Sequence, residues 1–404
     1  MIYRLYTRHL RHDPAHPDWP DRDRFVLSGG HASMVLYGAL HLAGYDVPME
    51  EIRRFRQLGS HCAGHPERGL LPGIEVTTGP LGQGVANAVG LAIAERLLAA
   101  RFNVDGVDVV DHRVIAECGD GDLMEGVSAE ASSLAGHLGL GKLTLLYDDN
   151  QVTLDGPARW AFTEDVATRY LGYGWHVVRL EEVDDLAAVD LAMKEAEAET
   201  ERPTIVIMHS HIGIGTPIHD DHRAHGAPVG PAYAAIAREL LHWPHPPFEI
   251  PEEVYRTWRS QVAERARARR DWLDRFAGYR SAYPDLATEL ERMMSSRLPD
   301  GWDADLPRFV VGGDELSTRV AGYSRSIPRP VRGCPPTRRG QSYAGDRGWL
   351  ARKAVSSARW FGVRWGLGKA TACRWLMTKI QNSSPSITRW IIPHVACIVW
   401  VAVL

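Results

Sequence analysis

Two short polar stretches, Gly119-Asp-Gly121 and Asp148-Asp-Asn150, carry the residue types most suited to chemistry in this sequence. Each follows an apolar run that predicts a β-strand. The carboxyl ends of adjacent strands in an open α/β sheet face one crevice, so we expect Asp120 and Asn150 to converge. Carboxylate, amide and carbonyl oxygens suit a hard cation, Mg²⁺ or Ca²⁺, and Mg²⁺ often completes its shell with phosphates. Taken alone, the first stretch also fits an Asx turn.

The elements that must position these stretches are strands alternating with helices. Between residues 20 and 230, β-rich runs alternate with Ala- and Leu-rich helical runs. This alternation predicts an α/β fold with a doubly wound, mostly parallel sheet and helices on both faces. The clearest predicted strands are Val114–Cys118, Leu143–Tyr147, Trp175–Leu180 and Thr204–Met208, and the clearest predicted helices are Val85–Ala100, Val127–Leu138 and Asp185–Ala198.

The polar stretches belong to a series of short blocks that runs through about residues 1–322. The blocks are Asp21–Ser28, Gly30-His31, Phe55–Leu58, Gly64–Glu67, Thr77–Gly84, Gly119–Gly121 with Glu125-Gly126, Asp148–Asn150 and His225–Pro228. In content and order they resemble transketolase, and Gly-Asp-Gly followed further on by Asn150 resembles the thiamine diphosphate motif. The resemblance therefore implies the thiamine diphosphate-binding fold.

The resemblance also implies a cofactor site, with thiamine diphosphate bound through Mg²⁺ or Ca²⁺. Asp120, Asn150 and the carbonyl oxygen of Val152 resemble the ligands of the cation, with Asn150 also contacting the cofactor. Gly121 stands where a backbone amide meets the diphosphate. The residues that resemble the lining of the cofactor's rings are Gly79, Pro80 and Leu81.

Three histidines resemble those around the thiazolium ring and the sugar substrate: His31, His65 and His225. The resemblance implies that they bind the cofactor and act in catalysis, through acid–base transfer and stabilisation of charge on sugar hydroxyls. Each also has a plainer interpretation. His31 could cap a helix, His65 could order a turn, and His225 could join His219 and His222 in a metal-binding loop.

The resemblance is incomplete at both ends. The family's earlier Ser-Gly-His-Pro-Gly block is not found after Met1, and the match fades between Leu306 and about Gly322. A second domain would supply the glutamate that activates the aminopyrimidine. We therefore expect a truncated transketolase domain, inactive alone. Its ancestral reaction transfers a two-carbon ketol unit from a ketose phosphate to an aldose phosphate, in a homodimer with Glu125 at the subunit contact.

Three alternatives stay open. The chain could be the amino-terminal subunit of a split transketolase, or a relative of dihydroxyacetone synthase. 1-Deoxyxylulose-5-phosphate synthase fits less well, because Glu125-Gly126 and Asp148–Asn150 favour transketolase. In the third alternative the chain is a non-catalytic module that binds nucleic acid through its basic tail.

Composition divides the 404 residues into unlike pieces. Residues 1–230 are predicted to bind thiamine diphosphate and metal, and residues 231–322 to form a proline-rich connection and a helical extension. Residues 323–404 hold 14 Lys and Arg, one acidic residue and 6 of the 13 Trp, whereas residues 1–322 carry a net charge of −17. This tail has no sustained periodicity, so we expect it to be disordered or translated from a shifted frame. The overall charge of −4 argues against a basic nucleic-acid binder.

Location is indicated by what the sequence lacks. The 5 cysteines are odd in number and form no C-x-x-C pair, which indicates a reducing cytoplasm. The first residues contain no apolar segment of the signal-peptide kind. The apolar run Trp390–Leu404 is shorter than the ~20 residues that span a bilayer and contains Pro393 and His394, so no membrane anchor is expected.

Overall fold

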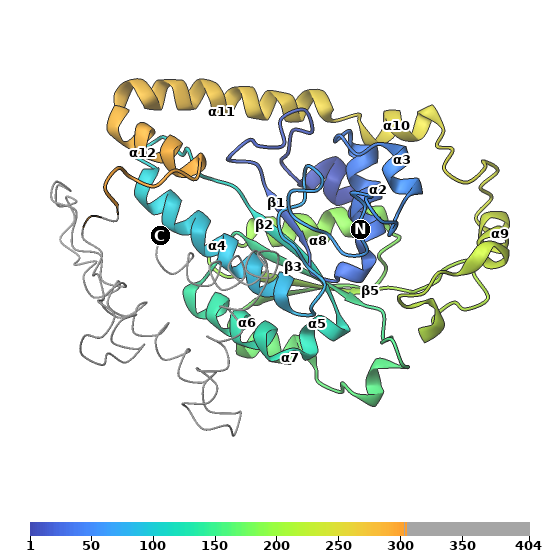
Figure 1. Cartoon of the computed structure of the whole chain (residues 1–404). Helices are drawn as coiled ribbons and strands as arrows, with labels where there is room; N and C mark the ends of the chain where they lie inside the picture. The colour runs from blue at the N-terminus through green and yellow to red at the C-terminus, as the bar shows by residue number, and fades with distance from the viewer. Residues whose placement is uncertain (303, 305–404) are drawn as a thin grey trace, which may run out of the picture. The chain divides into compact units, whose positions relative to one another are not determined.

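Five parallel strands form the central sheet of the computed structural model, which describes residues 1–302 and residue 304 (Figure 1). Their order across the sheet is β1-β2-β3-β5-β4, and every neighbouring pair is parallel. The predicted parallel α/β sheet is therefore confirmed. The strands span Arg24–Leu27 (β1), Val114–Gly119 (β2), Leu143–Asp149 (β3), His176–Leu180 (β4) and Thr204–His209 (β5).

Helices connect the strands and flank the sheet. The predicted helices correspond to α4, α6 and α8, each within two residues of the expected ends. The helices up to β5 are α1 (Ile2–Arg4), α2 (Ser33–Ala43), α3 (Met49–Arg53), α4 (Gln83–Phe102), α5 (Asp120–Met124), α6 (Gly126–Leu138), α7 (Val166–Gly172) and α8 (Leu186–Ala198), with short turns of other helix types at η1 (Leu5–His9), η2 (Gly30–Ala32) and η3 (Ala158–Trp160).

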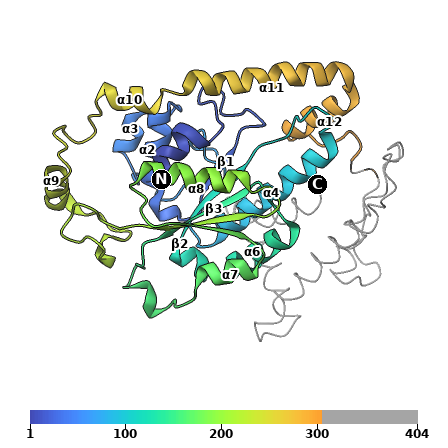
Figure 2. The same cartoon turned by 180° about the vertical axis from the view of Figure 1, so that it is seen from behind.

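Apolar cores lie on both faces of the sheet, because successive side chains of a strand point to opposite faces. In β3, Leu146 packs in one core with residues of α2 and α8. Its neighbours Leu145 and Tyr147 pack in a second core with residues of α4, α6 and α7. Figures 1 and 2 show the sheet between these two helical layers. The predicted doubly wound arrangement is confirmed.

A further group of helices follows β5 in the described part of the chain: η4 (His222–Ala224), α9 (Gly230–Leu240), α10 (Glu252–Trp258), α11 (Val262–Ala282) and α12 (Pro284–Met294). Trp272, Phe276 and Tyr279 of α11 form a third core with Phe102 of α4. The Tyr279 hydroxyl donates a hydrogen bond to the Phe102 carbonyl oxygen at 2.7 Å. Met1–Met294 is accordingly one compact unit. The predicted domain boundary at residue 230 stays a prediction.

The tail of the chain, residues 323–404, lies outside the described residues. The predictions of a disordered or frameshifted tail, of a nucleic-acid-binding arm and of a run too short for an anchor all concern that part. In the part that the structure describes, no helix is both long and apolar enough to cross a bilayer. Cys62 and Cys118, the cysteines in that part, are free and buried.

Candidate active site

The two polar stretches meet at the carboxyl edge of the sheet, as the sequence predicts. Gly119 of β2 pairs in register with Asp148 of β3. Helix α5 begins at Asp120, directly after β2, and so holds this carboxylate at the strand end. The expected helix near Val127 is present as α6, but α5 precedes it.

Asp120 is a buried carboxylate with one oxygen left open. Its side chain is 4% exposed. The Tyr147 hydroxyl donates a hydrogen bond to Oδ1 at 2.5 Å, whereas Oδ2 has no hydrogen-bond partner within the described chain. Burial raises the pKa of Asp120 to about 6, and the nearby Asp149 and Asp148 add to the rise while Tyr147 opposes it. A divalent cation would supply the missing partner and offset the crowded negative charge.

Asn150 lies in a tight turn beside Asp120. Its Oδ1 accepts a hydrogen bond from the backbone amide of Val152 at 3.0 Å, and its Nδ2 donates to Asp148 Oδ2 at 2.9 Å. Gln151 between them has a φ of 62°, and its backbone amide lowers the pKa of Asp120. The structure thus places Asp120 against the turn that contains Asn150 and Val152, and the Asn150 oxygen is bonded within that turn.

The stretch predicted to line the cofactor's rings lies in the loop before α4. A Cβ atom on Gly121 would be 3.0 Å from Leu81 Cδ1, so Leu81 closely approaches the start of α5. The loop ends in a turn in which the Gln83 amide donates to the Pro80 carbonyl oxygen at 3.4 Å. Gly79 has a φ of 140° and lies beside the ring of His65. This loop therefore joins the predicted diphosphate end of the site to the histidines.

The three predicted histidines come together from distant parts of the chain. The rings of His31 and His225 are 4.5 Å apart between centroids. Burial lowers the pKa of both, and the charge of His65 lowers that of His31 further against the opposing effect of Asp122. The Nδ1 atom of His225 is buried without a hydrogen-bond partner in the part of the chain described. Neutral imidazoles that share one space can donate and accept protons.

The structure also bears on the plainer interpretations of the three histidines, as a helix cap, a turn residue and a metal ligand. Helix η2, which contains His31, has no side-chain cap, so His31 does not act as one. The turn at His65 is held through its backbone, because the Tyr37 hydroxyl donates to the His65 carbonyl oxygen at 3.3 Å. A possible metal-binding group does include His219, but with His211 and Asp220 rather than with His222 or His225.

Two buried carboxyl groups at this edge, Asp122 and Glu117, were not predicted as site residues. Asp122 Oδ1 accepts hydrogen bonds from Ser28 Oγ at 2.6 Å and from the Gly82 amide at 2.7 Å, which ties three loops together. Glu117 Oε2 is buried without a partner in the described residues, and a Cβ atom on Gly29 would lie 3.3 Å from it. Burial raises the pKa of Glu117 well above its usual value, with help from Asp148 and Asp122. The one sequence signal for Asp122 is its position three residues after Gly119, where a carboxylate can accept a hydrogen bond from the backbone amide at the start of a helix.

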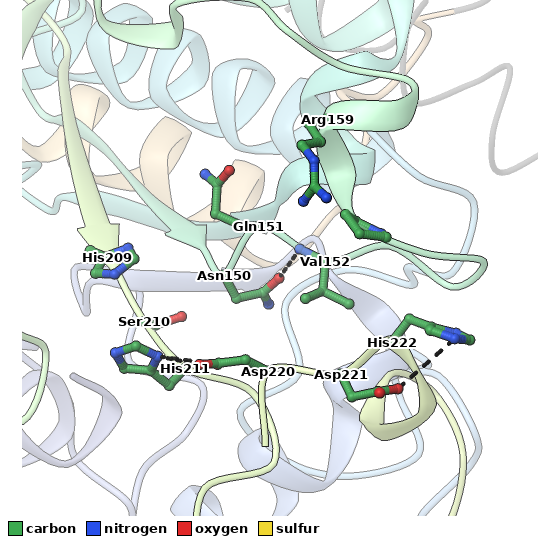
Figure 3. A pocket seen from close by; sticks show the side chains of 11 residues that line it. Asn150, Gln151, Val152, Arg159, His209, Ser210, His211, Asp220, Asp221 and His222 are labelled. Atoms are coloured by element: carbon green, nitrogen blue, oxygen red, sulfur yellow. Dashed lines mark hydrogen bonds and ion pairs between the residues drawn. The ribbon is translucent and has the colours of Figure 1, made fainter. Parts of the chain in front are cut away.

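A pocket of about 430 Å³ opens beside the predicted metal ligands (Figure 3). One wall is the turn from Asn150 to Val152, with Arg159 close by. The opposite wall is the segment that follows β5, including His211 and Asp220. The pocket joins the carboxyl ends of β3 and β5, where an open α/β sheet binds its ligands.

The fold and site define a class: an α/β protein with carboxylates, an amide side chain and imidazoles gathered at the carboxyl edge of a doubly wound parallel sheet. Residues 1–299 match the family model described as "Transketolase, thiamine diphosphate binding domain". The chain belongs to this transketolase family.

Curated relatives support the same family. A transketolase of Geobacillus stearothermophilus is 44% identical over 375 residues, which are 90% of this chain and 56% of that protein. The chromosomal transketolase of Cupriavidus necator is 50% identical over 78% of this chain and 47% of its own length. The chain thus spans about half the length of the curated relatives it matches. A match over 90% of the chain takes in part of residues 323–404.

Solved structures give the same answer for the fold. The transketolase from Leishmania mexicana superposes with a TM-score of 0.74 at 40% identity, covering 76% of this chain and 46% of that one. A transketolase from Pichia stipitis in complex with sedoheptulose 7-phosphate has a TM-score of 0.73 at 43% identity, over 77% of this chain and 46% of its own.

Proposed function

We propose that this chain binds thiamine diphosphate through a divalent cation, Mg²⁺ or Ca²⁺, and forms the diphosphate-and-metal part of a transketolase active site. The observation that carries the proposal is the buried carboxylate of Asp120, which has an open Oδ2 beside the turn at Asn150. Hard cations take oxygen ligands of this kind. The residues present therefore fit the group.

In this proposal Asp120, Asn150 and the carbonyl oxygen of Val152 hold the cation. The diphosphate would complete the cation's shell, as phosphates do for Mg²⁺. The backbone amide of Gly121, at the start of α5, is available to the same anion because the first amides of a helix have no partner within it. Gly79, Pro80 and Leu81 line the rings of the cofactor.

His31, His65 and His225 are proposed to move protons at the sugar hydroxyls and to stabilise charge there. Thiamine diphosphate, when bound, would supply the electron sink for carbanion chemistry. Lowered pKa values keep His31 and His225 neutral near pH 7, so that each can accept a proton. The reaction is transfer of a two-carbon ketol unit from a ketose phosphate to an aldose phosphate.

The activity of the whole family protein is a further step of the proposal. We expect the 404-residue chain to bind cofactor but not to complete ketol transfer alone, since it spans about half of its relatives and we assign none of its described glutamates to the aminopyrimidine. The same proposal includes sugar phosphates as the substrates. It also includes a homodimer with Glu125 at the subunit contact, and a cytoplasmic location. A split transketolase would bind cofactor in the same way.

Calorimetric titration of the chelator-treated full chain with thiamine diphosphate tests the proposal. Binding should require added Mg²⁺ or Ca²⁺. Binding of equal strength without a cation would remove the metal assignment. A coupled assay with ketose and aldose phosphates should show no turnover, and robust turnover by the purified chain would contradict its inactivity.

A further inference from the structure

The loop after β5 carries a second group of metal-ligating side chains, His211, His219 and Asp220. Each residue offers one ligand atom, and these atoms lie within 4.8 Å of one another. His211 Nδ1 is 2.9 Å from Asp220 Oδ2, and His219 Nε2 is 3.6 Å from the same oxygen. Two imidazole nitrogens and a carboxylate oxygen are therefore gathered around one point.

The spacing suits a small tetrahedral ion. With Zn–N bonds of about 2.0–2.1 Å, neighbouring ligand atoms of a tetrahedral site lie about 3.3 Å apart. The distances of 2.9 Å and 3.6 Å at Asp220 stand on either side of this value. The remaining separation, between the two imidazole nitrogens, is at most 4.8 Å, and rotation of the side chains can shorten it because all three residues face solvent.

The donor set differs from that of the proposed cofactor cation. Asp120, Asn150 and Val152 offer only oxygen, which suits Mg²⁺ or Ca²⁺. Imidazole with carboxylate suits Zn²⁺ and its neighbours, which bind nitrogen more strongly. The two sites should therefore select different ions.

The backbone brings the two ends of this loop together. The Asp220 amide donates a hydrogen bond to the Ile212 carbonyl oxygen at 2.9 Å, so residues next to His211 and His219 are paired. The loop stands at the rim of the pocket, and Figure 3 shows His211 joined to Asp220 with His209 on the same side. The rings of His209 and His211 are 5.1 Å apart. Water or His209 could take the fourth position, as open zinc sites allow.

We propose that His211, His219 and Asp220 form a binding site for a transition-metal ion of the Zn²⁺ class, separate from the cation that holds the cofactor. The site goes beyond the proposed function and does not depend on it.

The full chain, stripped of metal and free of thiamine diphosphate, should be titrated with Zn²⁺ by calorimetry and with Co²⁺ by visible absorption. We expect one site whose Co²⁺ spectrum shows tetrahedral coordination without thiolate charge transfer, which sets it apart from any cysteine site. His219→Ala and Asp220→Asn should each weaken binding more than about tenfold. Asn is chosen for Asp220 because its φ of 56° suits asparagine better than alanine.

The matched control is His222→Ala, a histidine of the same loop and pocket outside the ligand set. It should bind Zn²⁺ as the unmodified chain does. Circular dichroism should show the same folded signal for all variants, so that lost binding reports lost ligands. Equal Zn²⁺ affinity in the unmodified chain and a His211→Ala/His219→Ala variant would overturn the proposal, and so would an equal loss on His222→Ala.

Discussion

At the scale of single residues, two carboxylates two positions apart do different work. Both oxygens of Asp122 accept hydrogen bonds, from Ser28 and Gly82 at Oδ1 and from the Gly119 amide at Oδ2, so this side chain fastens loops. Asp120 has one oxygen bonded and one open. Of the two, only Asp120 has an oxygen that is free to coordinate a cation.

Asp120→Asn should abolish Mg²⁺-dependent binding of thiamine diphosphate, measured by calorimetry. The fold should survive. The pKa of Asp120 is raised from 3.8 to about 6, so its contribution to stability is fully present below pH 3.8 and is lost as pH rises through 6. Removing the charge should therefore not lower the melting temperature of the metal-free chain at pH 7. Asp155→Asn, an exposed change of the same charge on the neighbouring loop, is the control and should bind normally.

A second prediction at this scale concerns His12, which is buried between Tyr6 and Tyr45. Its Nε2 donates to the Tyr6 carbonyl oxygen at 3.1 Å, and its Nδ1 accepts from the Tyr45 hydroxyl at 3.0 Å. Burial lowers the pKa of His12 from 6.5 to about 3, and burial lowers that of His112 to about 4. Their contribution to stability is present above pH 6.5 and is lost as pH falls toward those values.

Denaturant unfolding from pH 7 to pH 4.5 should show this loss, at about 1.4 kcal/mol per pH unit for each group that only the unfolded chain protonates. His12→Gln should make the free energy of unfolding depend less steeply on pH, whether or not the substitution changes the stability at pH 7. His61→Gln, the same substitution at an exposed position, is the control and should keep the loss of stability toward pH 4.5. An unchanged slope in His12→Gln would show that His12 does not contribute to it.

At the scale of elements, α6 and the turn between α7 and β4 interlock. A Cβ atom on Gly136 would lie 1.8 Å from the Tyr173 carbonyl oxygen. The Trp175 indole nitrogen donates to the Ser132 carbonyl oxygen at 2.8 Å, again from this turn to α6. The turn precedes β4, so close packing at Gly136 helps to place an edge strand of the sheet.

Gly136→Ala should destabilise the chain by about 1–3 kcal/mol or more, because the added methyl group meets backbone that cannot move freely. Gly172→Ala in α7 is the matched change, since a Cβ there meets nothing within 4 Å. It should stabilise by up to about 1 kcal/mol through helix propensity. Chemical denaturation measures both, and equal effects of the two changes would contradict the close packing.

At the scale of the whole molecule, the last helices share the core of the α/β unit. Trp272 and Phe276 of α11 stack with ring centroids 5.1 Å apart and planes within 5°. The Trp272 indole donates to the Val109 carbonyl oxygen at 3.0 Å, in the segment before β2. Residues 231–294 should therefore unfold together with residues 1–230.

Phe276→Ala should cost about 3–5 kcal/mol, because Phe276 is 5% exposed and its loss leaves a cavity. Calorimetric melting should still show one transition over the described unit, moved to lower temperature. Leu273→Ala, on the same helix but 39% exposed, should move it far less. A separate early transition in Phe276→Ala would mean that the helical extension folds as its own domain, which would favour the boundary predicted at residue 230.

The sequence by itself determined four of the five strands, the helices α4, α6 and α8, and the edge of the sheet at which the polar stretches gather. Strand and helix periods are local, and the polar residues that end β2 and β3 follow directly from those periods. Among the elements that were not predicted are two at the site. β1, at Arg24–Leu27, is short, and α5 begins at a glycine-rich stretch that looks like a turn.

Only the tertiary structure decided which polar groups share a space. The register of β2 with β3 set Gly119 against Asp148, and the packing of distant loops brought His31 to His225. The same packing left Asp120 with an open oxygen and Asp122 with none. Such contacts join residues far apart in the chain, and the burial and charge that follow from them are properties of the assembled fold rather than of any local pattern.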